Sequence, residues 1–504
     1  MLKKALAIIL AINMCLAVCT ACQSGGTGAT GGTGVAGGTG TADGTGVAGG
    51  TGATGEEGKT GSAGTPGAAG NSGGAGSTGD ADNPEKISIT VGGWPAMDEA
   101  LNVILPLFNE KYPDIEVIVP ESMPKAGDWH PQLQAMLISG HGAPDVCLIE
   151  EARVGVFKDH GLLVNLYDEP YNARKYRDDF VDYKWNSAVS ADGKALAGLI
   201  WDIGPCTFFY NASIFEAAGL PVQPADVEEY LSTWEGFFDA CEKVHALSDD
   251  TWLIGSAADV FQWLWLGRDY YLFDPNSGPI LNFEQKPRFD EFLENSMKIR
   301  DMGWDANTRL WIDDESYTYY DTAQIAGIAS GAWMGGFFKS WMAVNQAGNF
   351  RVCRLPLGLP STNSGGSYMC IPEQSRNKEA AWKFIEFVLA TAEAQNKMFE
   401  AVDYFPAYKP AWNDRIYEEG DPFFGGQKTR ELWAQIAAEV TPPPFPTPMD
   451  SSVEWDIVTF FNDGMRLGLS KDKLRDFIRE NCLINAKDDT ESYIAVLREA
   501  GILH

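Results

Sequence analysis

The feature that most constrains the fold is a glycine- and threonine-rich tract over residues 23–83. The tract repeats a loose Gly-Thr-Gly rhythm and contains almost no large apolar side chains. Such a segment cannot bury enough apolar surface to offset its own ordering entropy, so we predict that it is flexible. A flexible coil of this length has an r.m.s. span of roughly 45 Å, enough to lift a domain clear of a membrane surface. We therefore predict a tether here, and a globular part built from residues 84–504.

Residues 1–22 have the layout of a lipoprotein signal peptide. Two lysines precede an apolar run that is too short to span a membrane comfortably. Cys19 and Cys22 form a C-x-x-C pair, but they lack the strand and helix of a redox motif and the second ligand pair of a zinc site. Small Ala21 precedes Cys22, as in the bacterial lipobox, whereas bulky Val18 precedes Cys19. We expect lipidation of Cys22, with plain secretion as the alternative.

Composition limits the size and the partners of the globular part. Residues 84–504 are too many for one compact core, which favours two domains. The formal net charge of −31 argues against nucleic acid or an anionic membrane surface as a partner. The later cysteines are scattered, so we expect small buried apolar side chains and not a disulfide framework. They are Cys147, Cys206, Cys241, Cys353, Cys370 and Cys482.

Hydrophobic periodicity predicts an α/β fold class. Apolar residues alternate over 87–91 and 115–119, and 146–149 reads as a buried strand. Helical spacing lies between these segments, with a bend expected at Pro106, and the alternation of strand and helix implies a parallel sheet. Further strands are predicted within 195–201 and 207–210, two short strands within 271–283, and helices from 377 and over 455–467.

Several segments together resemble a known family. They include FNEKYPDIEV (108–117), GAPDVCLIE (142–150), DGKALAGLIWDIGPCTFFYN (192–211) and NKEAAWKFIEFVLATAEAQ (377–395). In this order they are similar to the extracellular solute-binding proteins of ABC importers, family 1, the maltodextrin- and sugar-binding type. The resemblance implies a two-lobed, periplasmic-binding-protein-like (type II) fold that closes on a ligand between its lobes, with no cofactor, no metal and no chemistry on the ligand.

The resemblance also implies where the chain passes between the lobes. Crossings are expected near Asp202–Cys206, Gly327–Gly331 and Gly365–Cys370, where glycine and proline can absorb a hinge rotation. The expected ranges are 84–203 plus 329–368 for lobe 1, and 204–328 plus 369–504 for lobe 2.

Candidate ligand-binding residues are aromatic and acidic, because a sugar presents apolar C–H faces and many hydroxyls. Ligands in such folds sit at the carboxyl ends of strands, which favours Trp94, Glu150 and Asp202. Glu150 and Glu151 should face opposite ways on a strand, so only one can point at a ligand. The resemblance adds Trp333 and Trp455 as stacking positions. The full set of candidates is Trp94, Glu150, Asp202, Trp263, Trp333, Tyr368, Phe405 and Trp455, with core packing as the alternative for the aromatic members.

Two other functions stay open at this point. A secreted glycoside hydrolase would use a pair of carboxylates across the scissile bond, and Glu150 with Asp202 is the pair to test. A ferric-iron binding protein would use tyrosine pairs such as Tyr319–Tyr320 or Tyr270–Tyr271. We favour a monomeric, lipid-anchored binding protein, not an enzyme, on the extracytoplasmic face of a bacterial membrane. Its expected partners are a carbohydrate, the permease subunits of an ABC transporter and the membrane through its lipid, but no nucleic acid.

Overall fold

The computed structural model describes residues 86–95, 97–263, 273–274, 278–279, 287–441 and 447–503. The predicted signal peptide, the predicted lipidation site Cys22 and the predicted tether lie outside these ranges. Residues 85–504 form one compact unit. Within the described ranges, no helix has both the length and the apolar character needed to cross a membrane.

A five-stranded sheet organises the first part of this unit, in the order β2-β1-β3-β11-β4. β1 (Ile87–Gly92) pairs in parallel with β2 (Ile115–Ile118) and β3 (Val146–Glu150), which confirms the parallel arrangement predicted from periodicity. β11 (Ser367–Cys370) and β4 (Leu199–Ile200) extend the sheet in antiparallel fashion. The sheet is therefore mixed, because a strand distant in sequence returns to pair with β3.

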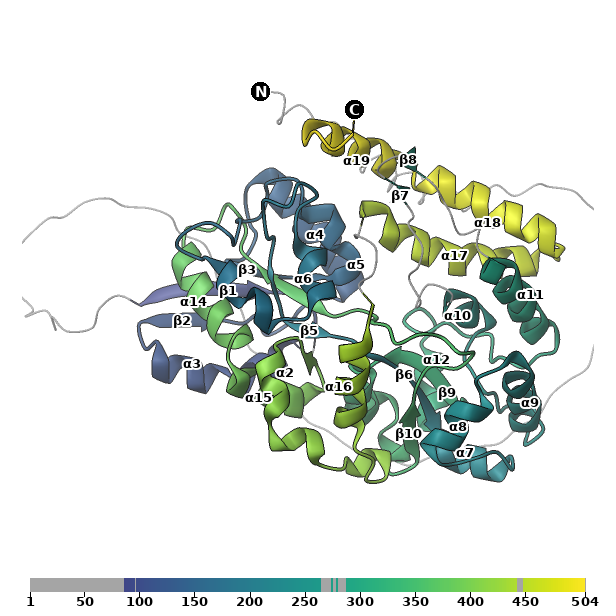
Figure 1. Cartoon of the computed structure of the whole chain (residues 1–504). Helices are drawn as coiled ribbons and strands as arrows, with labels where there is room; N and C mark the ends of the chain where they lie inside the picture. The colour runs from purple at the N-terminus through teal and green to yellow at the C-terminus, as the bar shows by residue number, and fades with distance from the viewer. Residues whose placement is uncertain are drawn as a thin grey trace, which may run out of the picture. The chain divides into compact units, whose positions relative to one another are not determined.

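Helices pack on this sheet (Figure 1). The predicted bend at Pro106 is instead a break, since α2 ends at Asn102 and Pro106 lies in the first turn of the next helix, where its missing N–H is harmless. The helix predicted from 377 is α14, which buries Trp382, Ile385 and Leu389 at helical spacing. The elements here are α2 (Met97–Asn102), α3 (Leu105–Lys111), α4 (Ala126–Ser139), α5 (Glu151–Phe157), η1 (Ala173–Asp179), α6 (Asp182–Ala188), α14 (Lys378–Leu389), α15 (Ala392–Val402) and η6 (Lys409–Asn413).

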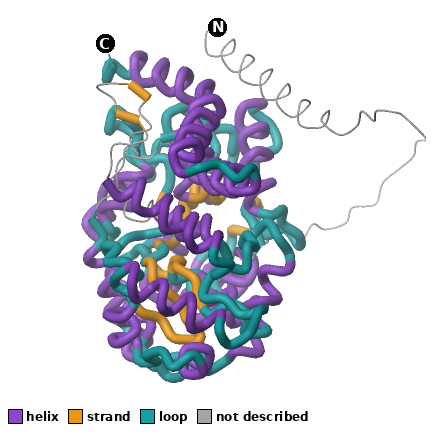
Figure 2. The backbone as a smooth tube through the Cα atoms, turned by 90° about the vertical axis from the view of Figure 1, so that its right-hand side faces the viewer, coloured by secondary structure: helices purple, strands orange, loops and turns teal. Residues whose placement is uncertain are grey.

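A second sheet has three antiparallel strands in the order β10-β6-β9. Figure 2 shows the strands in orange, with helices in purple around them. The central strand β6 (Cys206–Asn211) is buried at every residue, which agrees with the aromatic run Phe208–Tyr210 at its centre. β10 (Phe350–Cys353) and β9 (Gly327–Gly331) pair along its two edges. A separate pair, β7 (Phe273–Asp274) with β8 (Gly278–Pro279), confirms the two short strands predicted within 271–283.

The remaining helices belong with the second sheet or with each other. They are α7 (Ala212–Ala217), α8 (Pro224–Tyr230), α9 (Trp234–His245), α10 (Ala257–Gln262), α11 (Pro287–Asp301), α12 (Glu315–Asp321), α13 (Met334–Phe337), the π-helical turn η4 (Phe338–Met342), η5 (Val344–Gln346), η7 (Arg415–Glu418), η8 (Pro422–Phe424), α16 (Thr429–Glu439), α17 (Pro448–Arg466), α18 (Lys471–Asn485) and α19 (Lys487–Glu499). The helix predicted over 455–467 is the later part of α17, which packs on α18 and α10 and also contacts α5.

We call the elements around the five-stranded sheet lobe 1 and those around the three-stranded sheet lobe 2. The chain passes from one to the other between β4 and β6 and returns between β10 and β11, with the small sheet of β5 (Asp202–Ile203) and β12 (Phe405–Pro406) at the passage. β9 pairs with β6 along its whole length, so the crossing expected at Gly327–Gly331 is instead a strand of lobe 2. Two elements therefore lie in the other lobe from the one expected. β10 was expected in lobe 1 but pairs with the sheet of lobe 2, and α14 was expected in lobe 2 but packs on lobe 1.

The cysteines of the described part agree with expectation. All six are free and buried. Cys147 and Cys370 are register partners on β3 and β11, where they fill space between apolar side chains of the lobe 1 core.

Candidate functional site

Two crossing segments lie side by side where the lobes meet. The Gly204 amide donates to Asn363 Oδ1 at 2.7 Å, and the Ser364 amide donates to the Gly204 carbonyl at 2.8 Å. The Cys206 amide donates to the Thr362 carbonyl at 2.9 Å. A Cβ atom at Gly204 would come within 1.9 Å of the Ser364 carbonyl oxygen, so this approach requires glycine.

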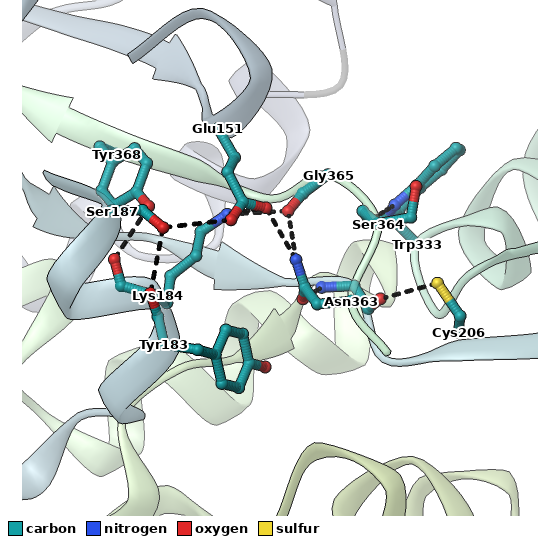
Figure 3. A network of polar contacts seen from close by, with 11 residues as sticks. Glu151, Tyr183, Lys184, Ser187, Cys206, Trp333, Asn363, Ser364, Gly365 and Tyr368 are labelled. Carbon is teal, nitrogen blue, oxygen red and sulfur yellow. Dashed lines mark hydrogen bonds and ion pairs between the residues drawn. The ribbon is translucent and has the colours of Figure 1, made fainter. Parts of the chain in front are cut away.

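A buried ion pair anchors the second of these crossings to lobe 1 (Figure 3). Lys184 Nζ lies 3.1 Å from Glu151 Oε2, and neither side chain is more than 1% exposed. Asn363 Nδ2 donates to the same carboxylate oxygen at 2.8 Å, and Lys184 Nζ donates to the Gly365 carbonyl at 2.7 Å. The Lys184 ammonium and the Glu151 carboxylate therefore compensate each other's charge where the chain returns to lobe 1, and both also form hydrogen bonds. A buried ion pair needs both kinds of interaction.

Glu150 faces the opposite way from Glu151, as the strand geometry predicts. Its side chain is 38% exposed, against 1% for Glu151. The Glu150 amide donates to His130 Nε2 at 3.1 Å, so Nδ1 carries the proton and donates to the Ala126 carbonyl at 2.9 Å. Burial lowers the pKa of His130 to about 4, which keeps the ring neutral. The half-buried ring of Trp94 lies 5.5 Å from the His130 ring.

The field at Glu150 comes from both lobes. Desolvation by the surrounding protein raises the pKa of the Glu150 carboxyl, and the positive charge of Arg153 lowers it. Asp202 and Glu454 raise it further, and Lys184 lowers it. Glu454 belongs to α17, so a helix of lobe 2 adds charge to the end of a lobe 1 strand. A carboxyl that is partly exposed yet desolvated is suited to hydrogen-bonding an uncharged polar ligand.

Asp202 lies at the first crossing as predicted, but it is only 4% exposed. Burial raises its pKa to about 6, and the Lys184 charge and hydrogen bonds with Ser367 act in the opposite direction. The side chain therefore belongs to the interior of the junction. Its predicted direct contact with ligand is not supported by this position.

Three predicted stacking residues are core residues. Trp263 packs 5.7 Å from Phe237 in the core of lobe 2. Tyr368 is fully buried on β11, and its hydroxyl donates to the Lys184 carbonyl at 2.9 Å. Phe405 is fully buried against Phe399 at 5.1 Å. All three rings are buried. Segments far away in sequence cover Trp263 and Tyr368, whereas Phe405 packs against the nearby rings of Phe399, Trp412 and Tyr417.

Tyr404 takes the place expected of Phe405. Successive residues of a strand point to opposite faces, so burial of Phe405 turns Tyr404 outward. Tyr404 is half-buried, with its ring 6.1 Å from that of Trp201. Burial raises its pKa, and Asp202 and Glu99 raise it further by their negative charge. The alternation in Tyr-Phe-Pro-Ala-Tyr was the signal that could have identified it.

Lobe 2 contributes two tryptophans with accessible surface, one of them at the junction. Trp333 follows β9 and is half-buried, and its Nε1 donates to the Ser364 carbonyl at 3.0 Å (Figure 3). Trp455 lies on α17 with 43% of its surface exposed. We define the candidate site by its accessible members, which are Trp94, Glu150, Trp333, Tyr404 and Trp455. In the described residues, no group of three or more His, Cys, Asp and Glu side chains is placed to hold a metal ion.

Comparison with solved structures defines the class of protein. The chain superposes with TM-score 0.65 on the ABC transporter associated binding protein from Bifidobacterium animalis subsp. lactis Bl-04, in complex with β-1,6-galactobiose, at 24% identity over 80% of this chain and 98% of that one. It superposes with TM-score 0.62 on the sugar-binding protein MalE of Xanthomonas citri, at 19% identity over 80% and 98%. The fold is thus the two-lobed α/β fold of MalE-type binding proteins.

Sequence comparison adds the family. Residues 107–419 match the model of the bacterial extracellular solute-binding proteins, and the chain belongs to this family. The arabinooligosaccharide-binding protein of Bacillus subtilis (strain 168) is 26% identical over 345 residues, which cover 66% of this chain and 77% of that protein. Its counterpart in Halalkalibacterium halodurans is 24% identical over 347 residues, covering 66% and 74%.

Proposed function

We propose that the protein captures an oligosaccharide outside the cell and delivers it to the permease of an ABC transporter. The observation that supports the proposal is that both lobes carry partly exposed aromatic rings and that charges of both lobes act on Glu150. Flat rings can stack on the apolar faces of sugars, and a desolvated carboxyl can accept hydrogen bonds from hydroxyls. The names of the curated relatives support the same ligand class.

Binding is proposed to work through closure of the lobes. Trp94, Glu150 and Tyr404 come from lobe 1, whereas Trp333 and Trp455 come from lobe 2. A ligand that touches both groups only in the closed state shifts an open–closed equilibrium by its differential affinity. The closely paired crossings at Gly204 and Ser364 are the region where we expect the rotation to occur.

The test is a thermal-shift and calorimetric screen over arabino-, malto- and galacto-oligosaccharides, with amino acids, peptides and ferric iron as comparators. A ligand present at a hundred times its Kd should stabilise the protein by about 2.7 kcal/mol. Trp333→Ala and Glu150→Gln should weaken the response, while Leu467→Ala, exposed at the far end of α17, should leave it unchanged. Stabilisation by amino acids or iron, and by no sugar, would overturn the carbohydrate proposal.

Binding without turnover is part of the proposal. A glycosidase would need two carboxylates that both reach the scissile bond, yet Asp202 is buried while Glu150 is accessible. Incubation of the protein with the sugar that binds best should therefore release no shorter products. Chromatographic detection of such products would favour the hydrolase.

The described tyrosine pair is also poorly placed for iron. Tyr320 is buried with its ring 5.4 Å from Phe338, whereas Tyr319 packs on Trp252 at 6.0 Å. The two hydroxyls belong to different packing environments, so they do not form a chelating pair. Tyr270 and Tyr271 lie outside the described residues.

A lipid anchor on Cys22 and a monomeric state complete the proposal. The support for the anchor is the signal-peptide layout and the small residue before Cys22. Cys22→Ala should release the protein into the medium, whereas the matched variant Cys19→Ala should leave it with the membrane fraction. Equal retention of both variants would refute anchoring at Cys22. Light scattering of the purified protein should give the mass of one chain.

A further inference from the structure

A group of aromatic side chains lies outside the candidate site, and the proposed function has not used it. We call Trp311, Tyr317, Phe337 and Trp341 the outer aromatic cluster. Trp311 and Trp341 are 40% and 47% exposed. The ring centroids of Tyr317 and Trp341 are 4.8 Å apart, and those of Trp311 and Phe337 are 5.5 Å apart. Large apolar rings gathered on a surface in this way mark interaction sites.

The outer aromatic cluster is continuous with the candidate site through Trp333. Trp333 lies 6.1 Å from Trp311 and 5.7 Å from Phe337, measured between ring centroids. Phe337 is followed at 6.0 Å by Trp341, four residues further along the same helical segment and therefore on the same face. A path of ring contacts thus leads from the inter-lobe junction to the exposed Trp341.

The local backbone holds Trp311 in an unusual conformation. Its φ is +72°, in the left-handed region that a bulky side chain rarely adopts. The Tyr317 hydroxyl is hydrogen-bonded to the Trp311 backbone, and the Arg309 amide donates to Asp313 Oδ2 at 2.8 Å to close the turn. Conformations of this kind cost of order 1–3 kcal/mol and concentrate at ligand-contacting sites. The turn thus fixes the Trp311 ring against Tyr317 and Phe337 while 40% of the residue stays exposed.

We propose that the outer aromatic cluster is an additional subsite that stacks the outer units of a longer carbohydrate chain. This inference rests on the proposed function, and it extends the ligand from a short sugar to an oligosaccharide that continues from Trp333 toward Trp341. Partly exposed Asp313 and exposed Asp314 stand on the turn that carries Trp311, where their oxygens can accept hydrogen bonds from hydroxyls. A carbohydrate is the occupant that fits best, because the cluster continues the stacking surface of the candidate site.

The test compares ligand lengths by titration calorimetry on the full chain. The probes are a disaccharide and a hexasaccharide of whichever series, arabino-, malto- or galacto-oligosaccharide, binds in the screen. Trp341→Ala and Tyr317→Ala should weaken hexasaccharide binding about three- to tenfold and leave disaccharide binding unchanged. Trp341→Phe should restore most of the affinity, and Trp333→Ala should weaken both ligands. Leu467→Ala changes an exposed apolar residue directly after α17 and is the control that should change neither.

Three outcomes would overturn the subsite. Equal affinity of Trp341→Ala and the unchanged protein for the hexasaccharide would remove it, even if Trp333→Ala still abolished binding and so supported the proposed function. A loss of uptake or of self-association in Trp341→Ala, with unchanged hexasaccharide affinity, would assign the cluster to the permease or to a second copy of the chain. Absence of carbohydrate binding by the unchanged protein would overturn the proposed function together with the subsite.

Discussion

The buried ion pair at the junction offers the sharpest test of the structure. Replacing Lys184 by Met removes the ammonium but keeps much of the apolar stem. Glu151 then stays buried as a carboxylate with Asn363 Nδ2, at 2.8 Å, as its closest remaining donor among the bonds described above. Breaking a buried pair on one side destabilises proteins by about 3–5 kcal/mol, because the remaining charge is uncompensated. We expect a loss of this size from Lys184→Met.

The double variant Glu151→Leu, Lys184→Met should be much less destabilised than the single variant. It removes both charges of the pair, and Asn363 Nδ2 keeps its bond to the Gly365 carbonyl at 3.0 Å. Asp202, on which both of these charges act, stays buried nearby. The matched control is Lys175→Met, which breaks an exposed lysine–glutamate pair of similarly short distance, 2.6 Å, with Glu386. An exposed pair contributes about 1 kcal/mol or less.

The measurement is urea unfolding of the full chain and its variants, followed by circular dichroism and tryptophan fluorescence. The two signals should give one transition, so that midpoints can be compared as stabilities. The expected order of midpoints places Lys184→Met far below Lys175→Met, with the double variant between Lys184→Met and the unchanged protein. A Lys184→Met midpoint equal to that of Lys175→Met would refute the buried pair.

Three further predictions concern single positions. Because burial raises the pKa of Asp202 to about 6, the folded state holds a proton that the unfolded state has lost above about pH 4. The Asp202 contribution to the free energy of unfolding should therefore fall by up to about 1.4 kcal/mol for each pH unit from pH 4 to pH 6, whereas His130, whose folded pKa is about 4, contributes in the opposite direction. In urea titrations, the difference in unfolding free energy between the unchanged protein and Asp202→Asn should show the Asp202 slope. Gly204→Ala should lower the free energy of unfolding, measured with urea, by about 1–3 kcal/mol, because its Cβ would overlap a carbonyl oxygen. Gly127→Ala is the control that should not lower it, because a Cβ at Gly127 meets no atom within 4 Å. Trp129→Phe should lose about 1–3 kcal/mol in the same assay, because Trp129 Nε1 donates to the buried Leu148 carbonyl at 2.8 Å and the carbonyl would lose this donor.

Local sequence predicted the parts of the fold that depend on periodicity. The strands at 87–92 and 115–118 alternate apolar and polar residues, as half-buried strands do, and the strand at 146–150 is an apolar run, as in a buried strand. Their parallel pairing follows from the helices that connect them. The partition of later segments between the sheets did not follow from local pattern. β9 is rich in glycine and reads as a hinge, yet it is a paired strand because β6 supplies its hydrogen bonds from more than a hundred residues away.

The candidate site divides in the same way. The opposite facing of Glu150 and Glu151 was predictable, because it depends only on the two-residue period of a strand. The burial of Trp263, Tyr368 and Phe405 was not, because it depends on tertiary contacts: with Phe208 for Trp263, with Lys184 for Tyr368, and with the paired strand β5 for Phe405. For the same reason Tyr404 was missed in favour of its neighbour.

The adjacency of Glu150 and Glu151 links the site to the junction in one physical unit. Glu151 is held by Lys184 and by Asn363 of the second crossing, while its amide donates to the Gly366 carbonyl at 2.9 Å. Glu150 precedes it by one peptide bond, so any rotation that shifts the crossing also shifts the accessible carboxyl. The reverse must hold for binding free energies, since linkage between two equilibria is reciprocal. A ligand that fixes Glu150 should therefore favour one arrangement of the crossing, and Lys184→Met should change ligand affinity even though Lys184 itself is fully buried.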